Sequence, residues 1–188
     1  GMLCSVLAED WYSYARRQIS AATRHWMAQL PREIRFEFAG LRFSVIHGGV
    51  DRINRFLFRS SPQQEFQQQL QLADCDVVIG GHCGLPFGLA LEQGCWLNAG
   101  VIGLPANDAS RSGWYMLLTE IENGVEVSWH RLAYDAERSF ESMQAAGLSA
   151  YADTLLTGLW PSMDILPAQE QAQQGCEIIL PPLQIQLA

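Results

Sequence analysis

The sequence predicts a layered α/β or α+β protein whose second half is largely β. Apolar residues recur at helical spacing in two segments, residues 5–30 and 61–75. Between residues 76 and 134, short apolar or alternating runs are instead bounded by glycine, proline and Asn-Gly turns, as strands are. The chain has 188 residues, 48% of them hydrophobic, which is enough for one domain with a sizeable core.

The first helix is predicted over residues 5–30, and Pro31 ends it. Its apolar positions form one stripe: Trp11, Ala15, Ile19, Ala22, Trp26 and Leu30. Residues 34–38 and 41–47 alternate in polarity around Ala39-Gly40, which predicts a hairpin. The helix over residues 61–75 is expected to start at an N-cap, Ser61, with Pro62 in the first helical position and Gln64 closing a capping box.

Strands are predicted for the rest of the domain, followed by two helices. The expected strands are residues 76–81, 95–103, 113–121 and 125–134, the last two joined at Asn123-Gly124. Helices are expected at residues 136–146 and 149–157. Residues 2–160 are interpreted as a single domain. Residues 161–188, rich in Gln and Pro, are interpreted as a tail that wraps the domain or is partly disordered.

Charge and cysteine content exclude several classes of function. The net charge is −8, Lys is absent and the arginines are scattered, so no basic stripe for nucleic acid is present. No run approaches 18 apolar residues, which argues against a membrane span. The five cysteines are widely spaced without a Cys-x-x-Cys pair, which favours free thiols and a cytoplasmic location.

Two histidines, His47 and His82, stand at the ends of apolar runs and are close to glycines. Imidazoles at the ends of neighbouring strands can meet at one point, and neutral imidazole is a common metal ligand. A strand-end histidine is more often a hydrogen-bonded structural group than a metal ligand, and spacing alone leaves both interpretations open. His25 and His130 are interpreted as structural residues.

Three motifs occur in an informative order: "VIHGG", "DVVIGGHCGLPF" and "WLNAGVIGLP". Together they resemble the second half of the calcineurin-like metallophosphoesterases, most closely the small bacterial phosphodiesterase-like branch. The resemblance implies an incomplete calcineurin-like β-sandwich flanked by helices. It also implies a metal-dependent phosphoester hydrolase, in which two adjacent metal ions clamp the phosphate and activate a water.

The resemblance assigns candidate roles residue by residue. His47 and His82 match two ligands of the family's second metal. Residues expected to shape the loops around them are Gly48, Gly81, Gly84, Asn98 and Gly100. Candidate phosphate contacts, alternatively plain surface charges, are Arg52, Arg55 and Arg111.

The sequence also departs from the family pattern. Gly84 stands where the family has a second histidine, and Cys83 replaces a threonine. The opening motifs Asp-x-His, Gly-Asp and Gly-Asn-His-Asp have no counterpart, so the chain is expected to begin after them. We therefore expect no dinuclear centre, at most one weakly bound Mn, Zn, Ni or Fe ion, and little or no hydrolysis. We also expect a homo-oligomer, most simply a homodimer, to cover the exposed part of the sheet.

Three interpretations remain at this point. The chain is a shortened form of an active phosphoesterase acting on a small phosphoester, or a degenerate, non-catalytic binding or regulatory module of the same fold. In the third interpretation the resemblance is incidental and the chain is an unrelated α/β domain.

Overall fold

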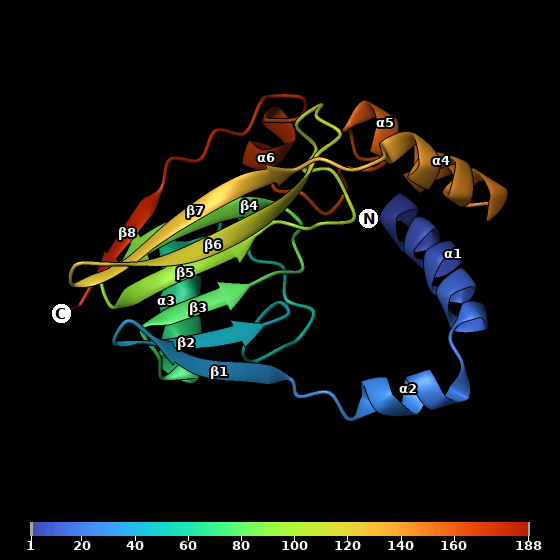
Figure 1. Ribbon diagram of the computed structural model, residues 1–188. Coiled ribbons are helices and arrows are strands. Elements are labelled where there is room, and N and C mark those ends of the chain that lie inside the picture. Colours follow the sequence, from blue (N-terminus) through green and yellow to red (C-terminus); the bar gives the residue numbers. More distant parts are fainter. Residues whose placement is uncertain (1, 188) are drawn as a thin grey trace.

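Two β-sheets face each other in the structure (Figure 1), a computed structural model that describes the backbone of residues 2–187 and the side chains of residues 8–187. The larger sheet has the order β1-β2-β3-β5-β4 and the smaller one β6-β7-β8. The larger sheet contains β1 (Glu33–Phe38), β2 (Leu41–Ile46), β3 (Val77–Gly80), β4 (Pro86–Leu91) and β5 (Gly94–Ala99). The smaller sheet contains β6 (Gly113–Ile121), β7 (Gly124–Leu132) and β8 (Leu183–Gln186). This mixed architecture confirms the predicted α/β class.

The direction of three strands creates the edge where the candidate site lies. Strands β2, β3 and β5 run parallel, so their carboxyl ends meet at one edge of the sheet (Figure 1). The predicted hairpin is confirmed: β1 and β2 pair antiparallel through a two-residue turn with φ of 48° at Ala39 and 78° at Gly40. Two successive positive φ angles suit the twist of a tight hairpin.

Helix α3 (Gln63–Ala73) covers one face of the larger sheet, behind it in Figure 1. Phe66 of α3 meets Trp96 of β5 edge-to-face, with ring centroids 5.4 Å apart, inside a buried apolar cluster. The predicted N-cap is wrong. The helix starts after Pro62 without a side-chain cap, because the Ser61 hydroxyl accepts a hydrogen bond from the amide of Phe58 at 3.0 Å instead.

A second apolar cluster lies between the two sheets and includes Phe43, Leu97 and Val127. The predicted strands 113–121 and 125–134 appear as β6 and β7. Because Ile121 pairs with Gly124, the turn between them is Glu122-Asn123, with φ of 63° at Asn123. The turn is thus one residue earlier than predicted.

The C-terminal segment packs along the sandwich. It contains α6 (Ala168–Ala172) and β8, which pairs antiparallel with β7. Leu166 is buried in the cluster beneath α3, and Trp160 packs against the same cluster. The segment therefore adds a strand to one sheet and apolar side chains to the core.

The predicted helix over residues 5–30 is two helices, α1 (Met2–Gln18) and α2 (Ala21–Ala28). The break falls where Ser20 caps α2 by accepting a hydrogen bond from the amide of Thr23 at 3.0 Å. Trp11 and Trp26 of the predicted apolar stripe are 45% and 59% exposed. The two helices stand to one side of the sheets (Figure 1).

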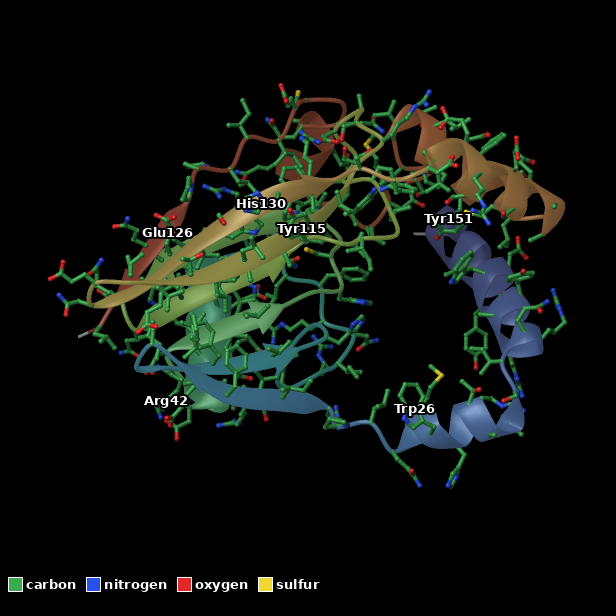
Figure 2. The ribbon with its side chains drawn as sticks, viewed as in Figure 1. Trp26, Arg42, Tyr115, Glu126, His130 and Tyr151 are labelled. Atoms are coloured by element: carbon green, nitrogen blue, oxygen red, sulfur yellow. The ribbon has the colours of Figure 1, made fainter. Side chains whose placement is uncertain are left out.

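The two predicted C-terminal helices are confirmed as α4 (Ala136–Ala145) and α5 (Ser149–Thr157). Tyr151 of α5 lies against Trp11 of α1, with ring centroids 6.2 Å apart (Figure 2). In the part of the chain that the structure describes, no helix is long and apolar enough to cross a membrane.

Arg42 on β2 and Asp76 before β3 form a pair that predicts a pH effect. The Asp76 carboxylate accepts hydrogen bonds from the Arg42 amide at 2.8 Å and from its guanidinium at 3.0 Å, and these bonds lower the pKa of Asp76. The stabilisation is present above the unfolded pKa of about 3.9 and lost as pH falls through the lower folded pKa. We expect Asp76→Asn to lower the urea midpoint at pH 7, with the deficit shrinking towards pH 2. A deficit independent of pH would contradict this. Asp153→Asn is the control, because Asp153 is an exposed residue of α5.

Candidate functional site

The two candidate ligands meet where β2 and β3 end. His47 directly follows β2, and His82 lies two residues beyond β3. His47 Nε2 and His82 Nδ1 are 2.9 Å apart, and the ring centroids are 4.8 Å apart at an angle of 61°. The predicted convergence of the two imidazoles at one edge of the sheet is confirmed. Their role as metal ligands stays a prediction.

The backbone and surroundings of His82 hold its ring in place. Its φ is 63°, a left-handed conformation that non-glycine residues adopt only when the surrounding structure compensates. The ring of Phe56 lies against the imidazole, with centroids 4.1 Å apart and the planes tilted by 30°. Burial, and to a lesser degree the charge of His47, lowers the pKa of His82. The neutral imidazole is therefore favoured, and that is the form that binds metal.

Two glycines allow the histidine loops to approach each other. A Cβ at Gly81 would lie 2.9 Å from the carbonyl oxygen of His47. A Cβ at Gly48 would lie 2.5 Å from the carbonyl oxygen of Ile53. Larger residues at these positions would push the loops apart, and with them the two imidazoles.

Asn98 ties the loop after β5 to the loop after β3. Its buried side chain accepts a hydrogen bond from the amide of Gly100 at 3.0 Å and donates to the carbonyl of Gly81 at 3.2 Å. It also donates to the sulfur of Cys83 at 3.1 Å. Burial raises the pKa of Cys83 to about 12, so this residue is a thiol at neutral pH when no metal is bound.

Gly84, at the position of the family's second histidine, has a conformation that disfavours side chains. Its φ is +73°, and a Cβ there would lie 3.3 Å from the indole of Trp160. We expect Gly84→Ala to destabilise the fold by about 1–2 kcal/mol because of the left-handed backbone. Gly84→His, which restores the family's residue, is expected to cost at least as much because its ring must also fit against Trp160.

Two other glycines provide matched controls for this urea-denaturation experiment. Gly147 has a φ of +76° with open space around it, so Gly147→Ala measures the backbone effect alone. Gly103 has neither a positive φ nor a neighbour within 4 Å, so Gly103→Ala should change stability little. A Gly84→His protein as stable as the original would contradict the expected cost.

The three candidate phosphate contacts differ in their surroundings. Arg55 pairs with Asp51 at 2.7 Å and Glu65 at 2.8 Å. Arg111 pairs with Glu137 and donates to the carbonyl of Leu156 at 3.0 Å. The side chain of Arg52 is exposed. Phosphate binding by Arg55 or Arg111 would compete with these carboxylates, and the role of all three stays a prediction.

Arg32 lies beside His47 and was not among the site residues that the sequence predicted. It lines a cavity of about 230 Å³ together with His47, Gly49 and Ile53. No motif identifies this arginine, because it follows Pro31 in the connection between α2 and β1. It becomes a neighbour of His47 only through the β1–β2 pairing, in which Glu33 lies opposite Ile46.

The residues at the site do not fit a dinuclear metal centre. Among residues 8–187, no group of three or more His, Cys, Asp or Glu side chains is placed to hold a metal ion. His47 and His82 together supply two nitrogen ligands, whereas a catalytic zinc site normally has three protein ligands. The histidine pair could therefore fill only two of the coordination positions of a single metal ion.

Comparisons with known proteins identify the fold. No protein-family model matches the sequence, and the curated proteins contain no significant match. A metallophosphoesterase from Sphaerobacter thermophilus superposes with a TM-score of 0.60 at 16% identity, over 76% of this chain and 64% of that one. A hypothetical protein from Pyrococcus horikoshii superposes with a TM-score of 0.65 at 12% identity, over 77% of this chain and 57% of that one.

The matched part of each neighbour is less than two thirds of that neighbour's length. At 12% and 16% identity the similarity establishes the fold and not the activity. The chain has the α/β fold of the calcineurin-like metallophosphoesterases, as its motifs suggested.

Proposed function

We propose that this chain is a metallophosphoesterase-like protein that binds at most one divalent ion, weakly, and hydrolyses phosphoesters little or not at all by itself. The observation that carries the proposal is the His47–His82 pair, whose ring nitrogens are hydrogen-bonded to each other at 2.9 Å. Among the described residues, no third His, Cys, Asp or Glu side chain is placed to complete a metal site with them. Two-metal hydrolysis needs ions on both the attacking and the leaving oxygen. Two imidazoles do not supply such a pair of sites.

The chain's own residues would act at the site as follows. His47 and His82 would hold a Mn, Zn, Ni or Fe ion, which would attract the oxygens of a small phosphoester when bound. Asn98 fixes the loop that carries His82 by bonding the carbonyl of Gly81. Arg32 lines the same cavity as His47 and would offer a phosphate oxygen a positive charge.

Titration calorimetry with Zn²⁺ tests the metal part of the proposal. We expect no more than one ion per chain at the histidine pair, with a Kd weaker than that of three- or four-ligand zinc sites. His47→Ala and His82→Ala are each expected to weaken binding at least about tenfold, because each removes one of two ligands. His130→Ala is the control, since His130 lies on β7 and bonds Ser128 instead. If His130→Ala weakened Zn²⁺ binding as much as His47→Ala and His82→Ala do, the result would contradict a site at His47 and His82.

A second candidate function is a non-catalytic binding module of the same fold. Exposed apolar side chains on the edge strand of the larger sheet favour it: Ile34 and Phe36 of β1. A module of this kind would keep its binding surface when both histidines are replaced, whereas a metal-dependent activity would be lost.

We also propose self-association, which the exposed Ile34 and Phe36 of β1 favour.

We further propose a reducing, cytoplasmic location. Four cysteines are free in the described side chains: Cys75, Cys83, Cys95 and Cys176. Three of them are buried, and burial raises the pKa of Cys75, Cys83 and Cys95. Unpaired thiols are typical of proteins in a reducing compartment.

A further inference from the structure

The N-terminal arm, residues 8–30, has an apolar surface that stays exposed. No residue of this arm is buried. Five large apolar side chains are at least 45% exposed: Trp11, Tyr12, Trp26, Met27 and Leu30. Helices as short as the eight-residue α2 are marginal in water unless they pack one face. The arm therefore needs a surface to pack on.

A second uncovered apolar surface lies on the larger sheet. Ile34 and Phe36 of β1 are 57% and 36% exposed. Phe36 stacks on Phe43, with ring centroids 4.9 Å apart, and Phe43 belongs to the core between the two sheets. Ile34 pairs with Val45 and Phe36 pairs with Phe43, so Ile34, Phe36 and Val45 lie on the same face as Phe43 and form the open sheet face. The smaller sheet lies over the other end of this face (Figure 1). The smaller sheet covers β4 and β5 but does not extend over β1.

The arm and the rest of the chain carry opposite net charges. The arm, residues 8–30, contains three arginines and two acidic residues, a net charge of +1. The rest of the chain contains nine arginines and eighteen acidic residues, a net charge of −9. The opposite signs of charge favour association of this weakly basic, apolar arm with an acidic body that has an uncovered apolar face.

We propose that the arm of one chain docks on the open sheet face of a second copy, and that the exchange is reciprocal, giving a twofold dimer. Within one chain, residues 29–32 connect α2 to β1, and Trp11 of the arm lies against Tyr151 of α5 (Figure 2). This placement leaves Trp26 and Met27 exposed and Ile34 uncovered. When two chains exchange arms, each arm covers the open sheet face of the other chain. The same type of contact then covers the arm and the open sheet face of both chains.

Light scattering over a range of concentrations tests whether a dimer forms through these surfaces. The expected mass is twice the chain mass of 21.0 kDa at micromolar concentration. Trp26→Glu and Ile34→Glu are each expected to raise the dissociation constant at least about tenfold, because each places a charge in an apolar contact. Leu72→Glu is the control, since Leu72 is 58% exposed on α3, away from both surfaces. A monomer at every concentration, or a dimer that neither variant weakens, overturns the proposal.

Disulfide trapping distinguishes a second copy from the chain's own arm. In a background with Cys4 and Cys176 replaced by serine, chains carrying Trp26→Cys are mixed with chains carrying Ile34→Cys and oxidised. A disulfide between two chains, seen at twice the chain mass on a non-reducing gel, is the expected result. A bond that forms only within single chains carrying both substitutions would mean that the arm folds back on its own sheet, and overturns the proposal. Circular dichroism of each variant verifies that it is folded.

Discussion

Purified chain supplied with Mn²⁺ is expected to hydrolyse an aryl phosphodiester, such as bis-p-nitrophenyl phosphate, no faster than the His47→Ala/His82→Ala double variant. The reason is the ligand count at the edge of the sheet. The structure brings two imidazoles together, and no cluster of three or more metal-binding side chains occurs among residues 8–187. A two-metal clamp on the attacking and leaving oxygens cannot be assembled from these side chains.

The expected loss of hydrolytic activity is large. Removing the central catalytic groups of a hydrolase lowers kcat by roughly 10³–10⁶-fold. We therefore expect a deficit of at least about a thousandfold relative to a metallophosphoesterase with a complete dinuclear site, assayed in parallel. Metal-dependent turnover within tenfold of that enzyme, lost in the double variant, would contradict the proposed function. Turnover retained by the double variant would indicate a contaminating enzyme.

Trp96→Ala is expected to lower the free energy of unfolding by about 3–5 kcal/mol, the usual cost of emptying a buried aromatic site. Trp96 is 1% exposed and lies between the sheet and α3, where it meets Phe66. Its indole occupies the space above Gly80, where a Cβ would lie 2.5 Å from the ring. Since domains are stable by only about 5–15 kcal/mol, this one substitution removes a large share of the total.

Urea denaturation followed by circular dichroism measures this loss. Trp96→Phe keeps an aromatic ring in the site and is expected to cost clearly less than Trp96→Ala. Leu117→Ala is the surface control, because Leu117 is 48% exposed on β6. A Trp96→Ala protein that unfolds at the same urea concentration as the control would show that α3 does not pack on the sheet as described.

Local signals in the sequence predicted the parts of the fold that local chemistry determines. The hairpin was identifiable because Ala39-Gly40 separates two alternating runs, and both residues take the positive φ that such a turn needs. Strand β4 was missed because Pro86 and Gly88 are typical strand breakers. They are tolerated because β4 is the last strand of its sheet.

The candidate site was predictable only in part, for a similar reason. His47 and His82 were identifiable because each follows an apolar run that forms a strand. Arg32 was not, because its proximity to His47 depends on how β1 pairs with β2. The bond from Asn98 to Cys83 joins residues 15 positions apart through the sheet, and no pattern in the sequence encodes it. The break in the first helix was not predicted because the apolar stripe continues across it, from Ile19 to Ala22, although Ser20 is a residue type that favours N-caps.

The most direct measurement of the central claim is a crystal of this protein soaked in Mn²⁺ or Zn²⁺ and examined by anomalous diffraction. A single peak within coordination distance of both His47 and His82 is the predicted result, with partial occupancy that disappears in the double variant. Two peaks about 3.5–4 Å apart at this edge of the sheet would show a dinuclear centre and contradict the account.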